Sequence, residues 1–469
     1  MKNLIRSLIL GLAILCSASG HAQSSGDVPF SLLGKIEPRH ACDIASSNWS
    51  VGAETMDRDY TIYEHWKDYL GPLGAKKARI QAGWAKTEPT PGVYNWAWLD
   101  EIIFDMHDQC VEPWINLSYG NPNYASGGGT RLGADMPASG EALDAWIQWI
   151  RGIVTRYGGV VDEWEIWNEG VHGGNTMELY MKLYIPTARA IRELQPKATI
   201  IAMSMAGTHP DLADEFLGNL ASRDLLHLVD EISYHPYSRN PDAVYDDVAD
   251  LRAAINKYSE SITIRQGENG APSEFRKTKA LSNYDWTELS QAKWTLRRLL
   301  GDLGRDIPSS YFSIMDLKYP DEMNRKGLLY ATEEKTVKYR KPAYHAMQNI
   351  TSIFDHSLQL IPEYPYLTKN EKSLSLFAFE KQSSGQQIVI IWFDGDIPSD
   401  MNEKTSLNFT FAQGQFDDPV YVDLRTGDVF EIPKSSIEKT GTRFVFSGIP
   451  VYDSPIAISD KDLIQIAQD

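Results

Sequence analysis

The sequence predicts an α/β fold: a (β/α)8 TIM barrel followed by a C-terminal all-β sandwich. Strand-like and helix-like segments alternate eight times between about residues 45 and 350, which is typical of that barrel. After about residue 355 the helical periodicity ends, and short strand-like runs separated by turns take over. A doubly wound open sheet is the alternative, but the glycine-rich phosphate turn expected after its first strand is absent.

The predicted barrel strands are short runs of mainly apolar, aromatic or small residues. They are Trp49–Ala53, Ala78–Gly83, Pro113–Ser118, Glu163–Trp167, Thr199–Ser204, Glu231–Tyr234, Ile262–Gly267 and Ser310–Met315. Between and after them, apolar residues recur at helical spacing. The predicted helices are Tyr60–Leu70, Trp98–Gln109, Gly140–Tyr157, Thr176–Leu194, Asp211–Ala221, Asp242–Tyr258, Glu288–Leu303 and Ala343–Phe354.

The second predicted strand has an alternation that fits a barrel wall. Arg79 and Gln81 share one face, whereas Ala78, Ile80 and Ala82 share the other. An arginine that points into a barrel needs partners, because an unpaired buried cation is very costly. We therefore expect carboxylates near the barrel mouth.

The sandwich strands are expected at Ser373–Glu380, Gln387–Phe393, Ser406–Phe411, Val420–Leu424, Val429–Ile432, Arg443–Phe446 and Ile456–Ser459. We expect this domain to support the barrel rather than to act as a separate glycan-binding module. The predicted segments are therefore a signal peptide at 1–22, the catalytic barrel at 23–354 and the sandwich at 355–469.

The first residues have the pattern of a cleavable signal peptide. Lys2 and Arg6 precede the apolar run Leu8–Leu15, and Gly20-His21-Ala22 resembles a cleavage site for small residues. The run is too short to span a bilayer. We expect a periplasmic or secreted protein without membrane insertion, with lipid attachment at Cys16 as an alternative.

Charge and cysteine content exclude several classes of function. The net charge of −18 disfavours nucleic acid and anionic membranes as partners. Cys42 and Cys110 would remain after cleavage, and free buried thiols are favoured over a disulfide. Residues with the spacing of a zinc or calcium site are absent, so we expect neither a metal nor a cofactor.

The segment Trp164–Gly170 contains the most informative residue. It is an aromatic strand that ends in Asn168-Glu169. Apolar surroundings penalise the charged form of a carboxyl group, so we expect Glu169 to keep its proton near neutral pH. Glu163 and Glu165 lie deeper in the same strand and are expected to be structural.

A second carboxylate lies at the end of the seventh predicted strand. With a period of two, Ile262, Ile264, Gln266 and Glu268 would point the same way. Strands four and seven lie nearly opposite each other in such a barrel, so Glu169 and Glu268 can meet over its axis. Paired carboxylates are what glycoside hydrolysis requires.

Several motifs together resemble clan A glycoside hydrolases. These motifs are Trp167-Asn168-Glu169, Gly267-Glu268-Asn269, Arg79 on strand two, and Ser233-Tyr234-His235-Pro236-Tyr237 on strand six. The pattern is most similar to family 39, which includes β-xylosidases and α-L-iduronidases. The resemblance covers the barrel and extends to the trailing sandwich.

The resemblance implies roles for individual residues. Glu169 matches the acid/base, Glu268 the nucleophile and Asn168 the amide that binds the sugar 2-hydroxyl. His235 and Tyr237 match residues that line the same pocket. Further expected substrate-binding residues are Arg79, Trp167, His172, Asn116, Tyr119 and Asn121.

Two positions depart from the family pattern. Gly170 stands where a proline commonly follows the acid/base, which we expect to loosen the loop that carries His172. Strand eight offers Tyr311, Phe312 and Asp316 where a tryptophan usually floors the subsite.

Two long segments, Tyr119–Ser139 and Ala271–Thr287, are expected to shape the substrate site. In the second of them, Arg276 or Lys277 could contact an acidic sugar.

The sequence thus predicts an exported retaining glycoside hydrolase that cleaves a poly- or oligosaccharide by a two-glutamate double displacement. A non-catalytic carbohydrate-binding protein and a transglycosylase are the alternatives. The sequence does not indicate the sugar, exo or endo action, or the oligomeric state.

Overall fold

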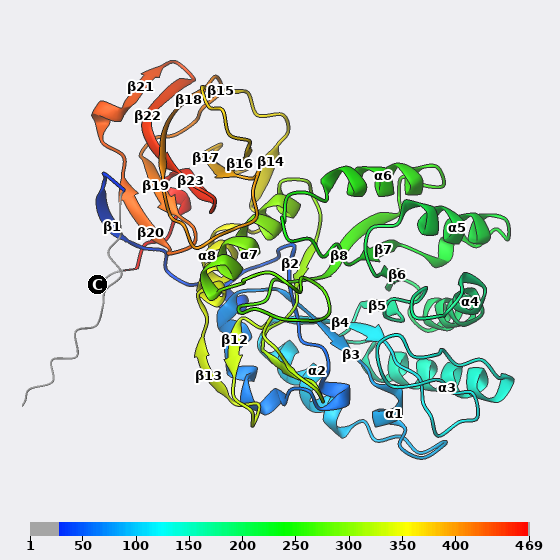
Figure 1. Cartoon of the computed structure of the whole chain (residues 1–469). Helices are drawn as coiled ribbons and strands as arrows, with labels where there is room; N and C mark the ends of the chain where they lie inside the picture. The colour runs from blue at the N-terminus through cyan, green and yellow to red at the C-terminus, as the bar shows by residue number, and fades with distance from the viewer. Residues whose placement is uncertain (1–27, 468–469) are drawn as a thin grey trace, which may run out of the picture.

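The computed structural model describes residues 28–467 and confirms the predicted barrel (Figure 1). Eight parallel strands close in the order β2-β3-β4-β5-β6-β7-β8-β9. Their bounds are β2 (Trp49–Gly52), β3 (Lys77–Gln81), β4 (Glu112–Leu117), β5 (Glu163–Ile166), β6 (Thr199–Met205), β7 (Glu231–Tyr234), β8 (Thr263–Asn269) and β9 (Ser309–Tyr311). The signal peptide predicted at 1–22, with Cys16, lies outside the described residues.

The α-helices surround this barrel close to their predicted positions. They are α1 (Trp84–Thr87), α2 (Ala97–Asp108), α3 (Gly140–Tyr157), α4 (Met177–Leu194), α5 (Pro210–Ala221), α6 (Tyr245–Asn256), α7 (Glu288–Leu303) and α8 (Pro342–Ile353). Hydroxyl side chains fix three of the starts: Ser139, Thr176 and Thr287 accept backbone N–H groups at the N-termini of α3, α4 and α7. Within residues 28–467, no helix is both long and apolar enough to cross a membrane.

The helix predicted at Tyr60–Leu70 is wrong. The segment forms short 3-10 turns, η3 (Tyr63–His65) and η4 (Lys67–Tyr69). Trp66 separates them with φ −135° and ψ −3°, outside the helical region. Its indole is fully buried and donates to Thr61 Oγ1 at 2.9 Å, so tertiary anchoring overrides helical periodicity.

The C-terminal domain consists of two antiparallel sheets, as predicted (Figure 1). One sheet has the order β1 (Ser31–Lys35), β20 (Asp428–Glu431), β19 (Pro419–Asp423), β23 (Ile456–Asp460), β17 (Gln387–Phe393), β16 (Leu374–Lys381) and β14 (Leu358–Ile361). The other has the order β15 (Tyr366–Thr368), β18 (Thr405–Phe411), β22 (Arg443–Val451) and β21 (Ile437–Thr440). The sequence placed residues 31–35 in the barrel domain, but β1 pairs with β20 and belongs to the sandwich.

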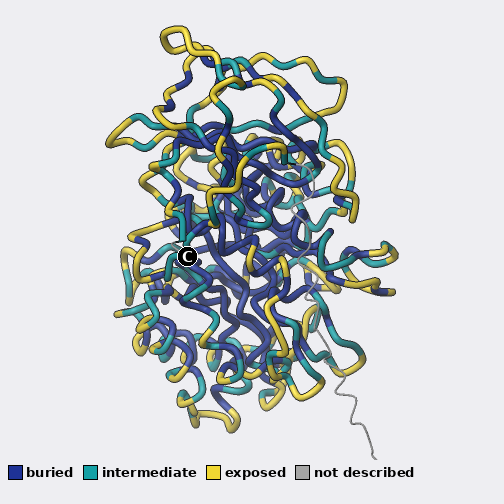
Figure 2. Tube along the Cα trace, turned by 90° about the vertical axis from the view of Figure 1, so that its left-hand side faces the viewer, coloured by how far each residue is buried: buried dark blue, intermediate teal, exposed yellow. Residues whose placement is uncertain are grey.

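The barrel and the sandwich share a continuous interface. One apolar core extends from the barrel helices to Ile388, Ile390 and Trp392 of β17, and Figure 2 shows this buried interior. Polar contacts reinforce it. Lys293 on α7 donates to Asp453 Oδ1 at 2.7 Å, and Arg297 donates to the carbonyls of Asp394 and Asp396, each at 2.9 Å.

Cys42 and Cys110 form a disulfide, so the prediction of free thiols is wrong. The bond joins the segment before β2 to the end of α2 and closes a loop of 68 residues. The sequence could not show this pairing, because the two cysteines approach only once the barrel has formed.

Candidate active site

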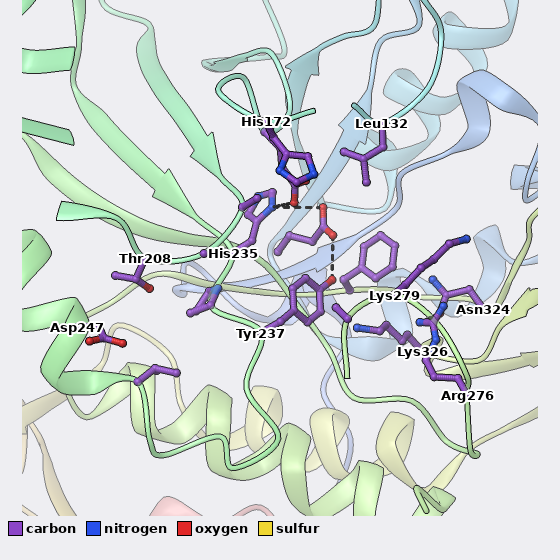
Figure 3. Close-up of a pocket in the computed structure, with 18 of the residues that line it drawn as sticks. Leu132, His172, Thr208, His235, Tyr237, Asp247, Arg276, Lys279, Asn324 and Lys326 are labelled. Carbon is purple, nitrogen blue, oxygen red and sulfur yellow. Dashed lines mark hydrogen bonds and ion pairs between the residues drawn. The ribbon is translucent and has the colours of Figure 1, made fainter. Parts of the chain in front are cut away.

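Two adjoining cavities open at the carboxyl ends of the barrel strands, where barrel enzymes place their active sites. The larger, of about 550 Å³, is lined by Glu169, His172, His235, Tyr237 and Glu268, among others (Figure 3). The smaller, of about 490 Å³, shares Glu268 with it. The two predicted catalytic residues therefore line one continuous site.

The backbone at the end of β5 turns Glu169 into this site. Trp167 and Glu169 both have left-handed backbones, with φ +65° and +52°. Trp167 is buried against Tyr119 and Trp146 on the outer side of the strand and lines neither cavity. Its predicted role in substrate binding is therefore not supported by its position. The N–H of Glu169 donates to Ser204 O at 2.9 Å and fixes the turn.

Glu268 reaches the site through a bulge that the sequence did not reveal. The pairing of β8 with β9 shifts register between Gln266 and Asn269. Before the bulge, Arg265 points inward to Glu163, whereas Gln266 points outward and accepts from Ser309 Oγ. The prediction that Gln266 and Glu268 share a face is therefore wrong.

Gly267 is required at this bulge. A Cβ there would lie 2.1 Å from Ser233 Oγ on the neighbouring strand. The close approach of β7 and β8 thus excludes any side chain just before Glu268.

Arg79 is completely buried and holds the carboxylates of the site together, as expected for an inward-facing arginine. Its Nη1 donates to Glu268 Oε2 at 3.1 Å and to Glu54 Oε1 at 3.0 Å. Its Nη2 donates to Glu165 Oε2 at 2.5 Å. Arg79 lines neither cavity, so its contacts orient Glu268 and do not reach the cavity itself. Glu165, like Glu163, is paired inside the barrel, as predicted.

Glu54, just after β2, is a third carboxylate at the site that sequence reasoning missed. Burial raises its pKa to about 7, with Glu268 adding to the shift and Arg79 opposing it. Arg79 also binds Glu165 and Glu268, so this one guanidinium does not offset the cost of burying the Glu54 charge. Its only sequence signal is a glutamate at the tip of the first strand.

His235 connects both predicted catalytic carboxylates. Its Nδ1 lies 3.1 Å from Glu169 Oε1 and 3.8 Å from Glu268 Oε2, and its Nε2 lies 3.0 Å from Ser204 Oγ. Burial lowers the pKa of His235, but Glu268 and Glu169 outweigh it and leave the pKa above its usual value. An imidazolium is therefore favoured between two carboxylates.

The pKa of Glu169 is lowered, which contradicts the expectation from its apolar surroundings. Burial raises this pKa, but the hydrogen bond and charge of His235 outweigh it, and His172 and Arg79 add to the lowering. The proton that an acid catalyst needs is thus shared with His235 in the free protein. The sequence could not show this, because His235 comes from another strand.

Tyr237 and Asn168 are placed as the sequence predicts. Tyr237 Oη donates to Glu268 Oε1 at 2.9 Å and lines the larger cavity. Asn168 lines the smaller cavity, where its Oδ1 accepts from Arg79 at 2.7 Å and its Nδ2 donates to Tyr119 Oη at 2.8 Å. Tyr119 lines that cavity as well.

The remaining predicted substrate-binding residues differ in position. His172 is exposed and lines the larger cavity. Asn116 and Asn121 are buried and line neither cavity. Asn116 donates to Glu165 Oε2 at 2.7 Å, and Asn121 donates to Glu88 O at 2.9 Å. Both therefore hold the protein framework instead of facing substrate.

Gly170 is tightly packed, so the departure from proline at this position leaves no room for a side chain. A Cβ at this position would lie 2.6 Å from Cδ2 of Tyr180 on α4. On the opposite wall, Phe312 lines both cavities, whereas Tyr311 and Asp316 are buried and line neither. Phe312 thus supplies the aromatic surface at the end of β9.

Within residues 28–467, no group of three or more His, Cys, Asp or Glu side chains could hold a metal ion. Carboxylates placed like Glu169 and Glu268 are groups that can transfer protons or act as nucleophiles.

Comparisons with known proteins relate the barrel to one family. The model for glycosyl hydrolases family 39 matches residues 81–267, which include Glu169 and His235 and stop just before Glu268. The chain is 25% identical over 227 residues to an intracellular exo-alpha-(1->5)-L-arabinofuranosidase of Streptomyces lividans. That match covers 47% of this chain and 33% of the relative, so the chain spans about a third of the relative's length.

Solved structures show the same fold over most of the chain. A family 39 glycoside hydrolase from Bacteroides cellulosilyticus has a TM-score of 0.61 and 18% identity, covering 88% of this chain and 81% of that one. A monomeric beta-xylosidase from Caulobacter crescentus has a TM-score of 0.59 and 15% identity, covering 92% and 98%. A family 39 enzyme from Xanthomonas axonopodis has a TM-score of 0.58 and 16% identity, covering 91% and 96%.

Proposed function

We propose that this chain, which is related in sequence and fold to the glycoside hydrolases of family 39, is a retaining glycosidase. The placement of Glu169 and Glu268 around His235 Nδ1 carries the proposal. From the two distances to Nδ1, of 3.1 and 3.8 Å, the facing carboxylate oxygens are at most about 7 Å apart. Retaining enzymes hold their carboxyl groups about 5–5.5 Å apart and inverting enzymes about 6.5–9.5 Å apart, so this upper bound includes the retaining range and only the lower end of the inverting range.

Glu268 is suited to act as the nucleophile. Both of its oxygens accept hydrogen bonds, Oε1 from Tyr237 and Oε2 from Arg79, and these two donors hold the carboxylate in one orientation. In the first step a Glu268 oxygen attacks the anomeric carbon, and the bond to the leaving oxygen breaks. This produces a covalent glycosyl ester on Glu268.

Glu169 is suited to transfer the protons of both steps. It gives a proton to the leaving oxygen in the first step. In the second step it takes one from water, whose oxygen attacks the anomeric carbon and releases Glu268. His235 Nδ1 lies 3.1 Å from Glu169 Oε1, so the imidazole can return a proton to this carboxylate between turnovers.

Substitution of the two glutamates tests the proposal. Glu268→Gln should lose more than about a thousandfold in kcat with any substrate, because no covalent intermediate can form. Glu169→Gln should show its largest loss in kcat with glycosides whose leaving groups are poor, because these need protonation. The loss in kcat should be smallest with nitrophenyl glycosides. Glu112→Gln, at the exposed start of β4, is the matched control and should be unaffected. Near-normal rates in both active-site variants would refute the assignment.

Retention is tested separately. Proton NMR during early turnover should show the product first in the same anomeric configuration as the substrate. Inversion would rule out the double displacement while leaving glycosidase activity intact. Arabinosides and xylosides are the first substrates to try, because similar proteins carry those names.

We also propose that the protein is exported. The N-terminal sequence pattern and the Cys42–Cys110 disulfide support this, because disulfides persist mainly in oxidising compartments. Expression of the full chain in a bacterial host should yield periplasmic protein whose mass corresponds to loss of about 22 residues. Intact protein confined to the cytoplasm would contradict export.

A further inference from the structure

We propose that this site binds a glycan unit that carries an anionic substituent, a carboxylate or a sulfate ester, and that Lys326 is its main counter-charge. The inference rests on the proposed function in one respect: the unit is bound beside Glu169 and Glu268. It concerns which sugar the site accepts, a property that the paired carboxylates leave open.

Lys326 is a buried cation without a hydrogen-bonding partner. It lies between β11 (Met323–Asn324) and β12 (Leu329–Ala331), is 2% exposed, and lines the larger cavity. Among residues 28–467, no acceptor is within hydrogen-bond distance of its Nζ. The group that can stabilise a positive charge on Nζ is the ring of Tyr237, whose centre lies 3.7 Å from Nζ. A buried ammonium in this state is expected to gain strongly from an anion.

Two neighbouring cations, unlike Lys326, have a carboxylate partner. Lys341 Nζ donates to Asp316 Oδ1 at 2.7 Å, and Arg325 Nη1 donates to Asp316 Oδ2 at 3.0 Å. The same stretch of chain therefore pairs two cations with one buried carboxylate. Lys326 is directed away from that pair and toward the cavity.

The backbone of Lys326 is held firmly in place. Its carbonyl oxygen accepts from Tyr311 Oη at 3.0 Å and from Gln291 Nε2 at 3.2 Å. Both donors are buried residues, on β9 and α7. The ammonium group is thus presented by the barrel framework, as a binding group has to be.

Two further cations lie on the same side of the cavity. Figure 3 shows Arg276, Lys279, Asn324 and Lys326 gathered there, opposite Thr208 and Asp247. Arg276 Nη2 lies 2.7 Å and Lys279 Nζ 3.1 Å from the same oxygen of Glu322. One carboxylate is thus shared by two cations, and within residues 28–467 Lys326 has no carboxylate in an ion pair with it.

Proton uptake is expected when an anion binds. Burial lowers the pKa of Lys326 well below its usual value, Arg276 lowers it further, and Glu268 raises it. The other ionisable groups that line the same cavity are Lys279, Tyr237, Tyr319, Glu169, His172, His235 and Asp247. An anion held at Nζ would favour the protonated amine, so affinity for it should fall as pH rises through this pKa.

The first experiment compares nitrophenyl glycosides that differ only in the substituent: glucuronides, glucoside 6-sulfates and glucosides, in both anomeric forms. One of the anionic sets should exceed the neutral set in kcat/KM by at least about tenfold. Lys326→Met should reduce that ratio by at least about tenfold. Lys338→Met removes the same charge from an exposed position that lines neither cavity and should leave the ratio unchanged.

The second experiment measures binding without turnover. Titration calorimetry of Glu268→Gln with glucuronate, glucose 6-sulfate and glucose should show binding of an anionic sugar with proton uptake, detected in buffers of different ionisation enthalpy. Adding Lys326→Met or Arg276→Gln should weaken it, with melting temperature measured to confirm folding. The carboxylate and sulfate probes distinguish the two sources of charge.

The outcomes separate the inference from the proposed function. Turnover of neutral glycosides with no anionic preference would overturn the inference and keep the hydrolase. If an anionic sugar binds, Lys326→Met weakens that binding and no glycoside is turned over, the inference would stand and the proposed hydrolase activity would be refuted. Anion binding that is unchanged in both Lys326→Met and Arg276→Gln would place the charge elsewhere and refute the role of Lys326.

Discussion

The hydroxyl of Tyr237 donates a 2.9 Å hydrogen bond to Oε1 of Glu268, at the end of the neighbouring strand. The other oxygen of that carboxylate is bound by Arg79. The proposed nucleophile is therefore oriented from two sides, by a neutral donor that borders the cavity and by a cation buried in the barrel.

Tyr237→Phe should lower kcat/KM by roughly 10- to 100-fold, because a hydrogen bond to a charged group contributes about 1.5–3 kcal/mol. Steady-state kinetics on a nitrophenyl glycoside measures the loss. Tyr234→Phe is the matched control: Tyr234 is buried at the end of β7, just before Tyr237 in the sequence, and its hydroxyl has no partner within residues 28–467. Equal losses in the two variants would mean that the Glu268 contact is unimportant.

His235→Asn should move the alkaline limb of the pH–rate profile to higher pH. His235 lowers the pKa of Glu169, and the first step needs Glu169 protonated, so removing the imidazole extends the acid form upward in pH. The profile of kcat/KM against pH reports the shift. His172→Asn should produce a smaller one, since His172 acts on Glu169 only through its charge. A limb that stays in place, or moves down, would contradict the His235–Glu169 coupling.

Glu54→Gln should stabilise the protein selectively at alkaline pH. The folded-state pKa of Glu54 is about 7, above the ordinary 4.5, so this group favours folding below pH 4.5 and loses that contribution as pH rises toward 7. Removing the titration should raise the unfolding free energy at pH 8 by up to about 3 kcal/mol relative to pH 4.5. Thermal melts across pH measure this.

Glu101→Gln, on the exposed face of α2, is the control for the Glu54 experiment. A difference between Glu54→Gln and the wild type that does not change with pH would show that Glu54 titrates normally in the folded protein.

Removal of the disulfide should destabilise the fold without altering the site. The loop of 68 residues closed by Cys42 and Cys110 predicts a loss of about 4 kcal/mol in the double variant Cys42→Ser/Cys110→Ser. The melting temperature of the double variant should not change with dithiothreitol. The melting temperature of the wild type should fall on reduction to a value close to that of the double variant. A wild-type protein unaffected by reduction would show that the bond contributes little.

Elements with strong local signals were predictable from the sequence. The bounds of α3 and α7 match the predictions at both ends, because Ser139 and Thr287 cap their starts and their apolar faces are regular. Glu169 and Glu268 were recognisable because each ends an apolar strand. The segment around Trp66 failed because its backbone follows a buried indole rather than a helical repeat.

The rest of the site depends on contacts between distant segments. Glu54, Ser204 and Lys326 are single polar residues in three separate parts of the chain, and nothing around them in sequence marks them as neighbours of the catalytic pair. The direction of Glu268 depends on a bulge whose only local sign is Gly267. The lowered pKa of Glu169 depends on an imidazole from another strand.

The pairing of β1 with β20 has a consequence for biosynthesis. Lys35 and its partner Asp428 are 393 residues apart, so the first strand to leave the ribosome meets its neighbour only when the chain is nearly finished. Until residues 428–431 have been made, β1 lacks the strand that it pairs with and exposes an unpaired edge. A chaperone that binds unpaired strands during synthesis would therefore have to remain bound to β1 for most of the time that the chain is being made.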